Sequence, residues 1–192
     1  MKKILVGTHN KGKFREISYL ISKKIKKISP SKLNIKAPKE TGKTFQANAE
    51  LKANYFSRLT SFPVISDDSG LCIYALGGEP GIYSARWAKK YGSFTKAMKV
   101  ILKKMENKTN RSATFVCSLS LKYPKRKIIT VIGKIYGSIS HKMLGSNGFG
   151  YDPIFIPRAK ALTFGQMNKL KKIKSDHRYI AFKKMKKRVK IF

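Results

Sequence analysis

The chain has 192 residues, and its 43 lysines and arginines against 9 aspartates and glutamates give a formal net charge of +34. Because 42% of the residues are hydrophobic, this charge does not imply disorder, and the length favours one domain spanning residues 1–192. No run of about 18 apolar residues exists to cross a membrane, and the few apolar residues that follow Lys3 are too short a stretch for a signal peptide, so we expect a cytoplasmic protein.

The N-terminal part of the chain is predicted to alternate short strands with helices. Residues 3–6 form a buried strand, and Asn10 caps a helix whose apolar residues recur at helical spacing up to residue 21. Residues 23–44 are rich in Lys, Ser and Pro and predict an irregular segment with a short strand near 33–35. A second helix is predicted over 45–59.

The remainder of the chain is predicted to be dominated by strands. The expected elements are strands at 63–66 and 71–76, a helix near 94–105, a hairpin of strands at 113–123 and 127–140, a glycine-bearing loop at 145–150 and a basic helix from about residue 176. An early β-α-β order followed by a long hairpin predicts a mixed α/β sheet. The two cysteines, Cys72 and Cys117, lie in strand-like runs and are interpreted as buried reduced thiols.

The loop from Gly7 to Phe14 joins the first strand to the first helix and contains Lys13. Backbone N–H groups at a helix start bind phosphate, and a lysine adds a positive charge. The loop nearly matches the P-loop pattern, but Phe14 stands where that pattern has a magnesium-binding hydroxyl. Phosphate binding and an ordinary strand-to-helix turn both fit the local pattern.

In the helix over 45–59, Lys52 falls in the middle of the apolar stripe and Asn48 at its edge. A lysine there must extend to solvent or meet an anion. Extension to solvent is the commoner outcome for a lone lysine, and an anionic ligand also fits here, because so few carboxylates exist to pair with this lysine internally.

Asp67 and Asp68 follow a predicted strand, where adjacent carboxylates suit a hard cation such as Mg²⁺, with Glu40 as a further ligand. The alternative is a solvated turn. Further along, Phe149 lies between two glycines, which leaves its ring accessible to stack on a flat ligand; a core aromatic in a tight turn is the alternative.

Taken together, these segments resemble the XTP/dITP pyrophosphatase family, the inosine triphosphate pyrophosphatases. The matching stretches run from one end of the chain to the other in the family's order: residues 8–13, 40–45, 48–53, 67–71, 77–86, 148–155, Thr163-Phe164 and His177-Arg178. Each stretch is weak alone, but eight in this order are specific.

The resemblance implies a mixed α/β fold with a long twisted sheet, flanking helices and two lobes around a central cleft, in a homodimer. It implies Mg²⁺-dependent hydrolysis of ITP, dITP and XTP to the monophosphate and pyrophosphate, which cleanses the nucleotide pool. In this reading Asp68 is the general base and, with Glu40, holds the magnesium. The implied substrate-binding residues are Thr8, His9, Asn10, Lys11, Gly12, Lys13, Lys52, Ser69, Arg86, Phe149, Gly150, Tyr151, Asp152, Lys172, His177 and Arg178.

The chain departs from the family's usual residues at Ala47, Tyr74, Gln166 and Asp176. The positive charge also supports an alternative function, a basic nucleic-acid-binding protein on the same fold that has lost activity. Retention of Glu40, Asp68 and Lys13 favours the enzyme. For the enzyme too, we expect weak, sequence-independent binding of DNA or RNA to the basic surface, and no membrane partner.

Overall fold

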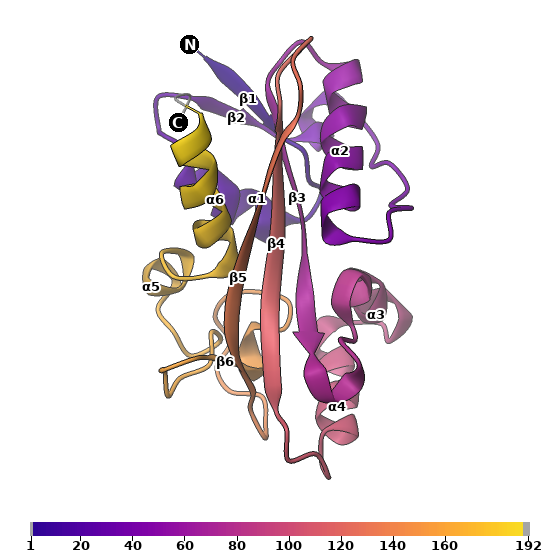
Figure 1. Ribbon diagram of the computed structural model, residues 1–192, viewed down its shortest axis with the longest axis vertical. Coiled ribbons are helices and arrows are strands. Elements are labelled where there is room, and N and C mark those ends of the chain that lie inside the picture. Colours follow the sequence, from indigo (N-terminus) through magenta and orange to yellow (C-terminus); the bar gives the residue numbers. More distant parts are fainter. Residues whose placement is uncertain (1, 190–192) are drawn as a thin grey trace. The chain divides into compact units, whose positions relative to one another are not determined.

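A computed structural model describes residues 2–189, so the ends of the predicted domain, residue 1 and residues 190–192, lie outside the described residues. The helices and strands follow in the order β1 (Lys3–Val6), α1 (Lys11–Leu20), β2 (Lys26–Ile28), α2 (Phe45–Leu59), β3 (Val64–Ile73), α3 (Ser84–Lys90), α4 (Phe94–Lys104), β4 (Ser112–Lys122), β5 (Ile129–Ile139), β6 (Phe155–Pro157), α5 (Lys169–Ile173) and α6 (His177–Arg188). Figure 1 shows these elements along the chain.

The strands form one six-stranded sheet in the order β2-β1-β3-β4-β5-β6. β1 pairs in parallel with both β2 and β3, whereas β5 and β6 are antiparallel. Parallel neighbours require crossover connections, which α1 and α2 supply. The mixed α/β sheet predicted from the sequence is therefore confirmed.

The chain divides into two compact units. Unit 1 comprises Met1–Asp68, Cys117–Gly133 and Arg178–Phe192, and unit 2 comprises Ser69–Val116 and Lys134–His177.

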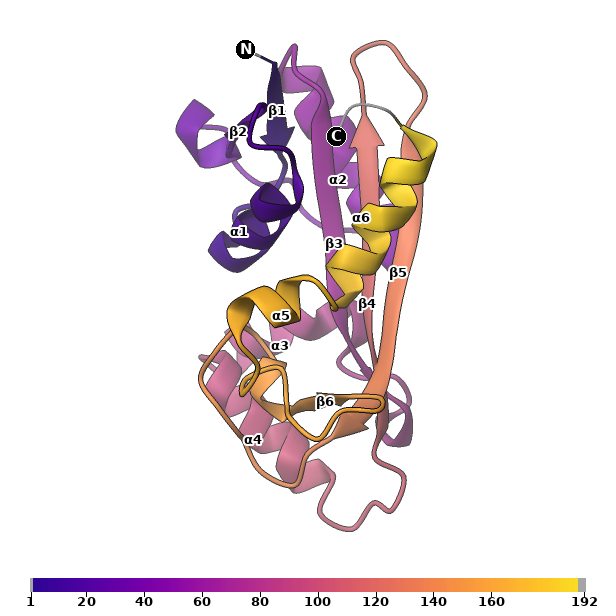
Figure 2. The same cartoon turned by 90° about the vertical axis from the view of Figure 1, so that its left-hand side faces the viewer.

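The core of unit 1 follows from the alternation of side chains along β1. Ile4 and Val6 pack in one cluster with residues of α1 and α6, while Leu5 joins Phe56 of α2 in another. Figures 1 and 2 show α1 and α6 on one side of these strands and α2 on the other. Burial on both faces is typical of parallel strands.

In unit 2, the core joins β3 to α4 and to a group of aromatic rings. Leu71 and Ile73 pack in one cluster with Ala97 and Ile101, all of them buried. The cluster also contains Phe115, Phe155 and Phe164, whose rings contact one another.

Several predicted elements are confirmed. Asn10 caps α1, the helix α2 has the predicted bounds, and both long strands and the C-terminal basic helix are present. Both cysteines are reduced thiols; Cys117 is buried, but Cys72 is only half-buried. No helix in the described part of the chain combines the length and apolarity that a membrane crossing needs.

Two predictions were wrong. The short strand lies at Lys26–Ile28, and the segment from Pro30 to Leu33 is a 3₁₀ helix, which the fixed φ of proline favours at its start. The predicted break at Asp67-Asp68 does not exist, because β3 runs without interruption through both aspartates. Polar residues can continue a strand when basic side chains partner them, which sequence pattern does not reveal.

Candidate active site

Carboxylates are scarce, and most of them are inside the protein. Five of the chain's nine are buried: Glu16, Asp67, Asp68, Asp152 and Asp176. Buried carboxylates require partners, and each of these five is paired with a lysine or arginine. The buried acids therefore mark where the basic side chains converge.

The loop before α1 is fixed by its own side chains. Asn10 accepts hydrogen bonds from the backbone N–H groups of Gly12, at 2.9 Å, and Lys13, at 3.1 Å. Thr8 in turn accepts one from the N–H of Asn10 at 3.2 Å. Asn10 therefore occupies two of the backbone donors at this helix start, and the side chains of the loop are further groups for phosphate.

A hollow of about 430 Å³ lies beside this loop in unit 1. Thr8, His9, Lys11 and Arg15 line it, so two cations and two hydrogen-bonding side chains face the same space. His9 is oriented by a 2.9 Å contact between its Nε2 and the carbonyl oxygen of Ile35. This composition suits an anionic ligand.

Two lysines of unit 1 converge on Asp68. Lys13 Nζ lies 3.4 Å from Asp67 Oδ2 and 3.9 Å from Asp68 Oδ1. Lys52 Nζ lies 2.5 Å from Glu40 Oε1 and 3.8 Å from the same Asp68 Oδ1. One oxygen of Asp68 therefore faces both ammonium groups.

The expectation that too few carboxylates exist to pair with Lys52 was wrong. Lys52 is only 8% exposed, and its ammonium has Glu40 and Asp68 as internal partners. Burial by itself lowers the pKa of Lys52, but attraction to Asp68, Asp67 and Glu40 outweighs burial and raises that pKa. Lys52 therefore stays charged despite lying on an apolar stripe.

Asn48 holds the other oxygen of Asp68. Its Nδ2 donates to Asp68 Oδ2 at 3.1 Å, and its Oδ1 accepts from the Gly42 N–H at 2.8 Å. Asn48 thus ties the segment that follows Glu40 to β3. Burial raises the pKa of Asp68, and the nearby Lys13 and Lys52 only partly offset this effect. A carboxylate with a raised pKa is a better proton acceptor than an ordinary aspartate.

Arg178 lies in the same unit with two carboxylates. Its Nη1 donates to Glu16 Oε2 at 2.9 Å, and its Nε donates to Asp67 Oδ2 at 3.3 Å. The side chain is 3% exposed. A contact between Arg178 and a base stays a prediction.

The carboxylate oxygens around Lys52 are suitable ligands for a magnesium ion. Glu40 and Asp68 offer hard carboxylate oxygens, and both reach the same ammonium, so they converge on one region. Mg²⁺ is commonly held by one or two carboxylates completed by waters and substrate phosphates. Within residues 2–189, no group of three or more His, Cys, Asp or Glu side chains is arranged to hold a metal.

The predicted base-binding segment in unit 2 is organised around Lys172. This lysine is 2% exposed, and its Nζ lies 3.3 Å from Asp152 Oδ2 and 3.1 Å from Asp176 Oδ2. It also lies over the rings of Phe149 and Phe164, at 5.2 and 5.4 Å from their centroids. Lys172 therefore contacts the glycine loop.

Asp152 also fixes the conformation of that loop. Its Oδ2 accepts the Phe149 N–H at 2.9 Å. Gly148 has a φ of 79°, and a Cβ there would lie 2.1 Å from the same oxygen. Only glycine fits at this position.

The other predicted residues of unit 2 have varied surroundings. Tyr151 is buried and donates to the Ser84 carbonyl oxygen at 2.9 Å, and burial raises the pKa of its hydroxyl. His177 stacks on Phe115, with ring centroids 4.8 Å apart.

The remaining predicted residues of unit 2 are more exposed. Arg86 is exposed on α3, with its guanidinium 4.9 Å from the centroid of the Tyr83 ring. The half-buried Ser69 and Gly150, with a φ of 68°, complete the set. Their contacts with substrate stay predictions.

Comparison with known proteins gives a consistent result. Residues 4–188 match the Ham1 family. A dITP/XTP pyrophosphatase of Caulobacter vibrioides is 40% identical over 186 residues, which cover 96% of each chain. The structure of the Staphylococcus aureus Ham1 protein matches with a TM-score of 0.87 and 36% identity, covering 98% of each chain. A HAM1 protein from Coxiella burnetii matches with the same TM-score and 31% identity, covering 97% of this chain and 98% of the other.

The chain belongs to the Ham1 family. The resemblance inferred from its motifs is thereby confirmed, as is the fold.

Sequence reasoning did not assign site roles to Glu16, Asn48 and Phe115. The scarcity of acid was a usable signal for Glu16, because a carboxylate in so basic a Ham1 chain is expected to have a cationic partner. Asn48 was placed at the edge of the stripe that carries Lys52, and its contact with Asp68 depends on the tertiary fold. No local pattern pointed to the stacking of Phe115 on His177.

Proposed function

We propose that this Ham1-family chain is a hydrolase that converts dITP, XTP and ITP to the monophosphate and pyrophosphate, and so removes non-standard purines from the nucleotide pool. The names of the relatives at about 40% identity support this function. The observation that carries the chemistry is the placement of Asp68 Oδ1 between two ammonium groups, Lys13 and Lys52.

In this proposal Asp68 accepts a proton from the attacking water. Its raised pKa suits that role, and the hydrogen bond from Asn48 fixes the carboxylate plane. Lys13 and Lys52 stabilise the negative charge of the phosphates. Thr8, His9 and Lys11, which face the hollow beside the loop, bind the remaining phosphate oxygens.

Glu40 and Asp68 would hold Mg²⁺. When bound, this ion polarises phosphoryl oxygens and offsets the charge of the triphosphate. Lys52 is already paired with both carboxylates, so it is placed to keep them together before substrate arrives.

Base recognition is assigned to Phe149 and to His177-Arg178. The half-buried ring of Phe149 offers an apolar face for any purine. Arginine carries only hydrogen-bond donors, so Arg178 satisfies a 6-keto oxygen but not the 6-amino group of adenine. Ser69, Arg86 and the loop residues Gly150–Asp152 complete the proposed substrate contacts.

The test is an assay of pyrophosphate release from dITP, XTP, ITP, ATP and GTP, with Mg²⁺ and with a chelator. We expect release of pyrophosphate, rather than phosphate, from the first three nucleotides, and loss of that release with the chelator. Asp68→Asn controls for a contaminating enzyme. Phosphate as the product, or equal rates with ATP and ITP, would contradict the proposal.

A homodimer and a cytoplasmic location are also part of this proposal, since the resemblance implies the first and a nucleotide-pool enzyme requires access to that pool. Light scattering on the purified chain tests the dimer. The rival function, a nucleic-acid-binding protein without activity, is not favoured, because Glu40, Asp68 and Lys13 are retained in one ionic cluster.

A further inference from the structure

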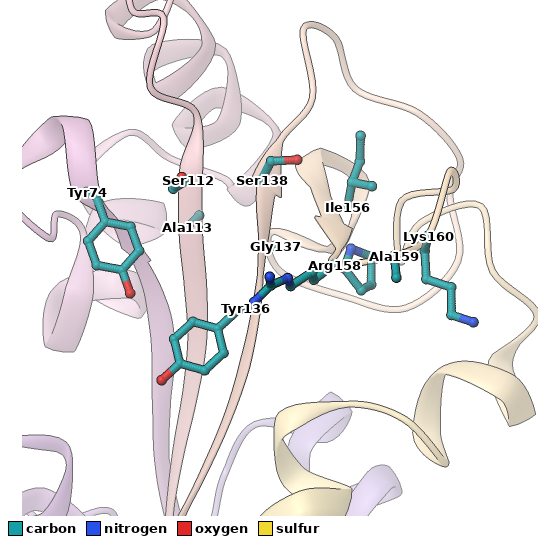
Figure 3. Close-up of a pocket in the computed structure, with 11 residues that line it drawn as sticks. Tyr74, Ser112, Ala113, Tyr136, Gly137, Ser138, Ile156, Arg158, Ala159 and Lys160 are labelled. Atoms are coloured by element: carbon teal, nitrogen blue, oxygen red, sulfur yellow. The ribbon is translucent and has the colours of Figure 1, made fainter.

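An open hollow of about 450 Å³ lies in unit 2, lined by none of the residues assigned to hydrolysis. Two tyrosines and two basic residues, Tyr74, Tyr136, Arg158 and Lys160, are among the residues that line it. Figure 3 shows both tyrosine rings on the same side of β4 and β5, with the Arg158 side chain reaching toward Tyr136. Each tyrosine is 52% exposed, so its ring is available to a ligand.

These groups are held in place by a side-chain hydrogen bond and by backbone pairing. The Tyr74 hydroxyl shares a 2.8 Å hydrogen bond with Thr114 Oγ1, which restrains the ring. The backbone N–H of Arg158 donates to the backbone carbonyl oxygen of Tyr136 at 2.8 Å. Next to Tyr136, Gly137 pairs with Pro157, and a Cβ at Gly137 would lie 2.2 Å from the Ile156 carbonyl oxygen. The close approach of β6 to β5 therefore depends on glycine and fixes Arg158 beside a tyrosine.

The composition of the hollow indicates its ligand. None of the described residues that line it is acidic, while Arg158 and Lys160 are both exposed. Aromatic rings beside cations match the two faces of a nucleotide, a flat base and an anionic phosphate. In a duplex the base faces are covered by stacking, whereas a single strand leaves them accessible.

We propose that this hollow binds single-stranded nucleic acid, with bases stacked on Tyr74 and Tyr136 and phosphates on Arg158 and Lys160. This binding is distinct from weak attraction to the whole basic surface, because it requires the aromatic rings. It is also independent of hydrolysis.

The experiment measures binding of a short fluorescein-labelled oligothymidylate to the full chain by fluorescence anisotropy at physiological salt. Tyr136→Ala is expected to weaken binding about 5-fold or more, since stacking on one ring contributes that much per base. Tyr19→Ala is the matched control, because Tyr19 is 47% exposed and lies on α1. Tyr136→Phe keeps the ring and is expected to bind as the unaltered chain does.

Two further comparisons separate stacking from charge. An abasic strand of the same length carries the same phosphates but no bases, and is expected to bind the unaltered chain more weakly than oligothymidylate does. Because it has no base to stack, it is expected to bind Tyr136→Ala and the unaltered chain equally. Arg158→Ala is expected to lower the slope of log affinity against log salt by about 0.7, the value for one phosphate contact on a single strand. Arg58→Ala, an exposed arginine of α2, is the control for charge alone.

Equal binding of the abasic and normal strands would overturn the proposal, as would equal losses in Tyr136→Ala and Tyr19→Ala. Unchanged oligothymidylate binding in Tyr136→Ala, together with a change of oligomeric state in sedimentation, would assign the hollow to a contact between copies instead. Circular dichroism and pyrophosphate release from dITP, both expected to be unchanged in Tyr136→Ala, confirm that the variant is folded.

Discussion

Lys52 in unit 1 and Lys172 in unit 2 are both buried, and each is paired with two carboxylates. Their surroundings differ. The Glu40 side chain beside Lys52 is 29% exposed, whereas both carboxylates beside Lys172 are at most 3% exposed. Two aromatic rings also cover Lys172.

This difference in exposure indicates that two ion-pair clusters of similar composition serve different purposes. Around Lys52, the half-buried carboxylate of Glu40 would let the proposed metal ion or a phosphate replace existing partners. Around Lys172, the partner carboxylates are almost inaccessible to solvent, and the ion pair with Asp152 holds the loop that carries Phe149. We infer that the first cluster serves chemistry and that the second serves positioning.

The largest effect is expected from Lys172→Met, which removes the ammonium from the sealed cluster. Asp152 and Asp176 then remain buried without it, and breaking such a pair costs about 3–5 kcal/mol of unfolding free energy. Urea unfolding measures the loss. Lys171→Met, at the exposed neighbouring position, is the control and should change little. Unchanged stability in Lys172→Met would remove the contrast between the two clusters.

Asp68→Asn should lower kcat at least ~100-fold, as expected when a general base is lost. It should not destabilise the protein at neutral pH. Burial raises the pKa of Asp68 in the folded state, so the stability this group contributes is fully present below its unfolded pKa of about 3.9 and is lost as pH rises through the folded pKa.

The stability of Asp68→Asn relative to the unaltered chain should therefore increase with pH across that window. Thermal unfolding without added metal, set beside single-turnover kinetics, checks both parts. Near-normal turnover, or a fall in stability at neutral pH as large as that of Lys172→Met, would place Asp68 in a structural role.

Arg178→Ala tests whether a third buried cation also contacts the substrate. The change removes a partner of Glu16 and Asp67 and is expected to lower stability. The ratio of kcat/KM for ITP to that for ATP is insensitive to the fraction of folded protein. This ratio should fall about 10-fold or more, the value of a hydrogen bond from a charged donor. An unchanged ratio would limit Arg178 to holding Glu16 and Asp67. Phe149→Ala is the control, because it is expected to lower kcat/KM for ITP and for ATP by similar factors.

The smallest effect is expected from Lys52→Met, which should lower the unfolding free energy by about 1 kcal/mol, because its partner Glu40 regains water. Since the fold raises the pKa of Lys52, this contribution is fully present below the unfolded pKa of about 10.4 and disappears as pH rises through the folded pKa. Unfolding measured from neutral to alkaline pH checks the sign. A loss as large as that of Lys172→Met would mean that both clusters are closed.

The longer helices and the long strands were predictable because their apolar residues recur at the period of each structure and because Asn10 and Thr44 are good helix caps, whereas the short helices α3 and α5 were not predicted. The continuous path of β3 was not predictable, because adjacent aspartates in sequence favour a turn. Their partners, Lys13 and Arg178, come from distant parts of the chain. For the site, motif order named the residues, but the pairing of Lys52 with Glu40 became visible only in three dimensions.

Because most carboxylates are buried, the protein surface is more uniformly positive than the composition alone indicates. The acids that are not buried are all glutamates, namely Glu40, Glu50, Glu79 and Glu106. Among the described lysines and arginines, by contrast, only Lys52, Lys172 and Arg178 are buried. Such a surface repels itself, and dissolved ions relieve that repulsion within about 10 Å. In colloidal terms the folded chain is a polycation whose counterions contribute to its stability, so its stability is expected to fall as the buffer is diluted.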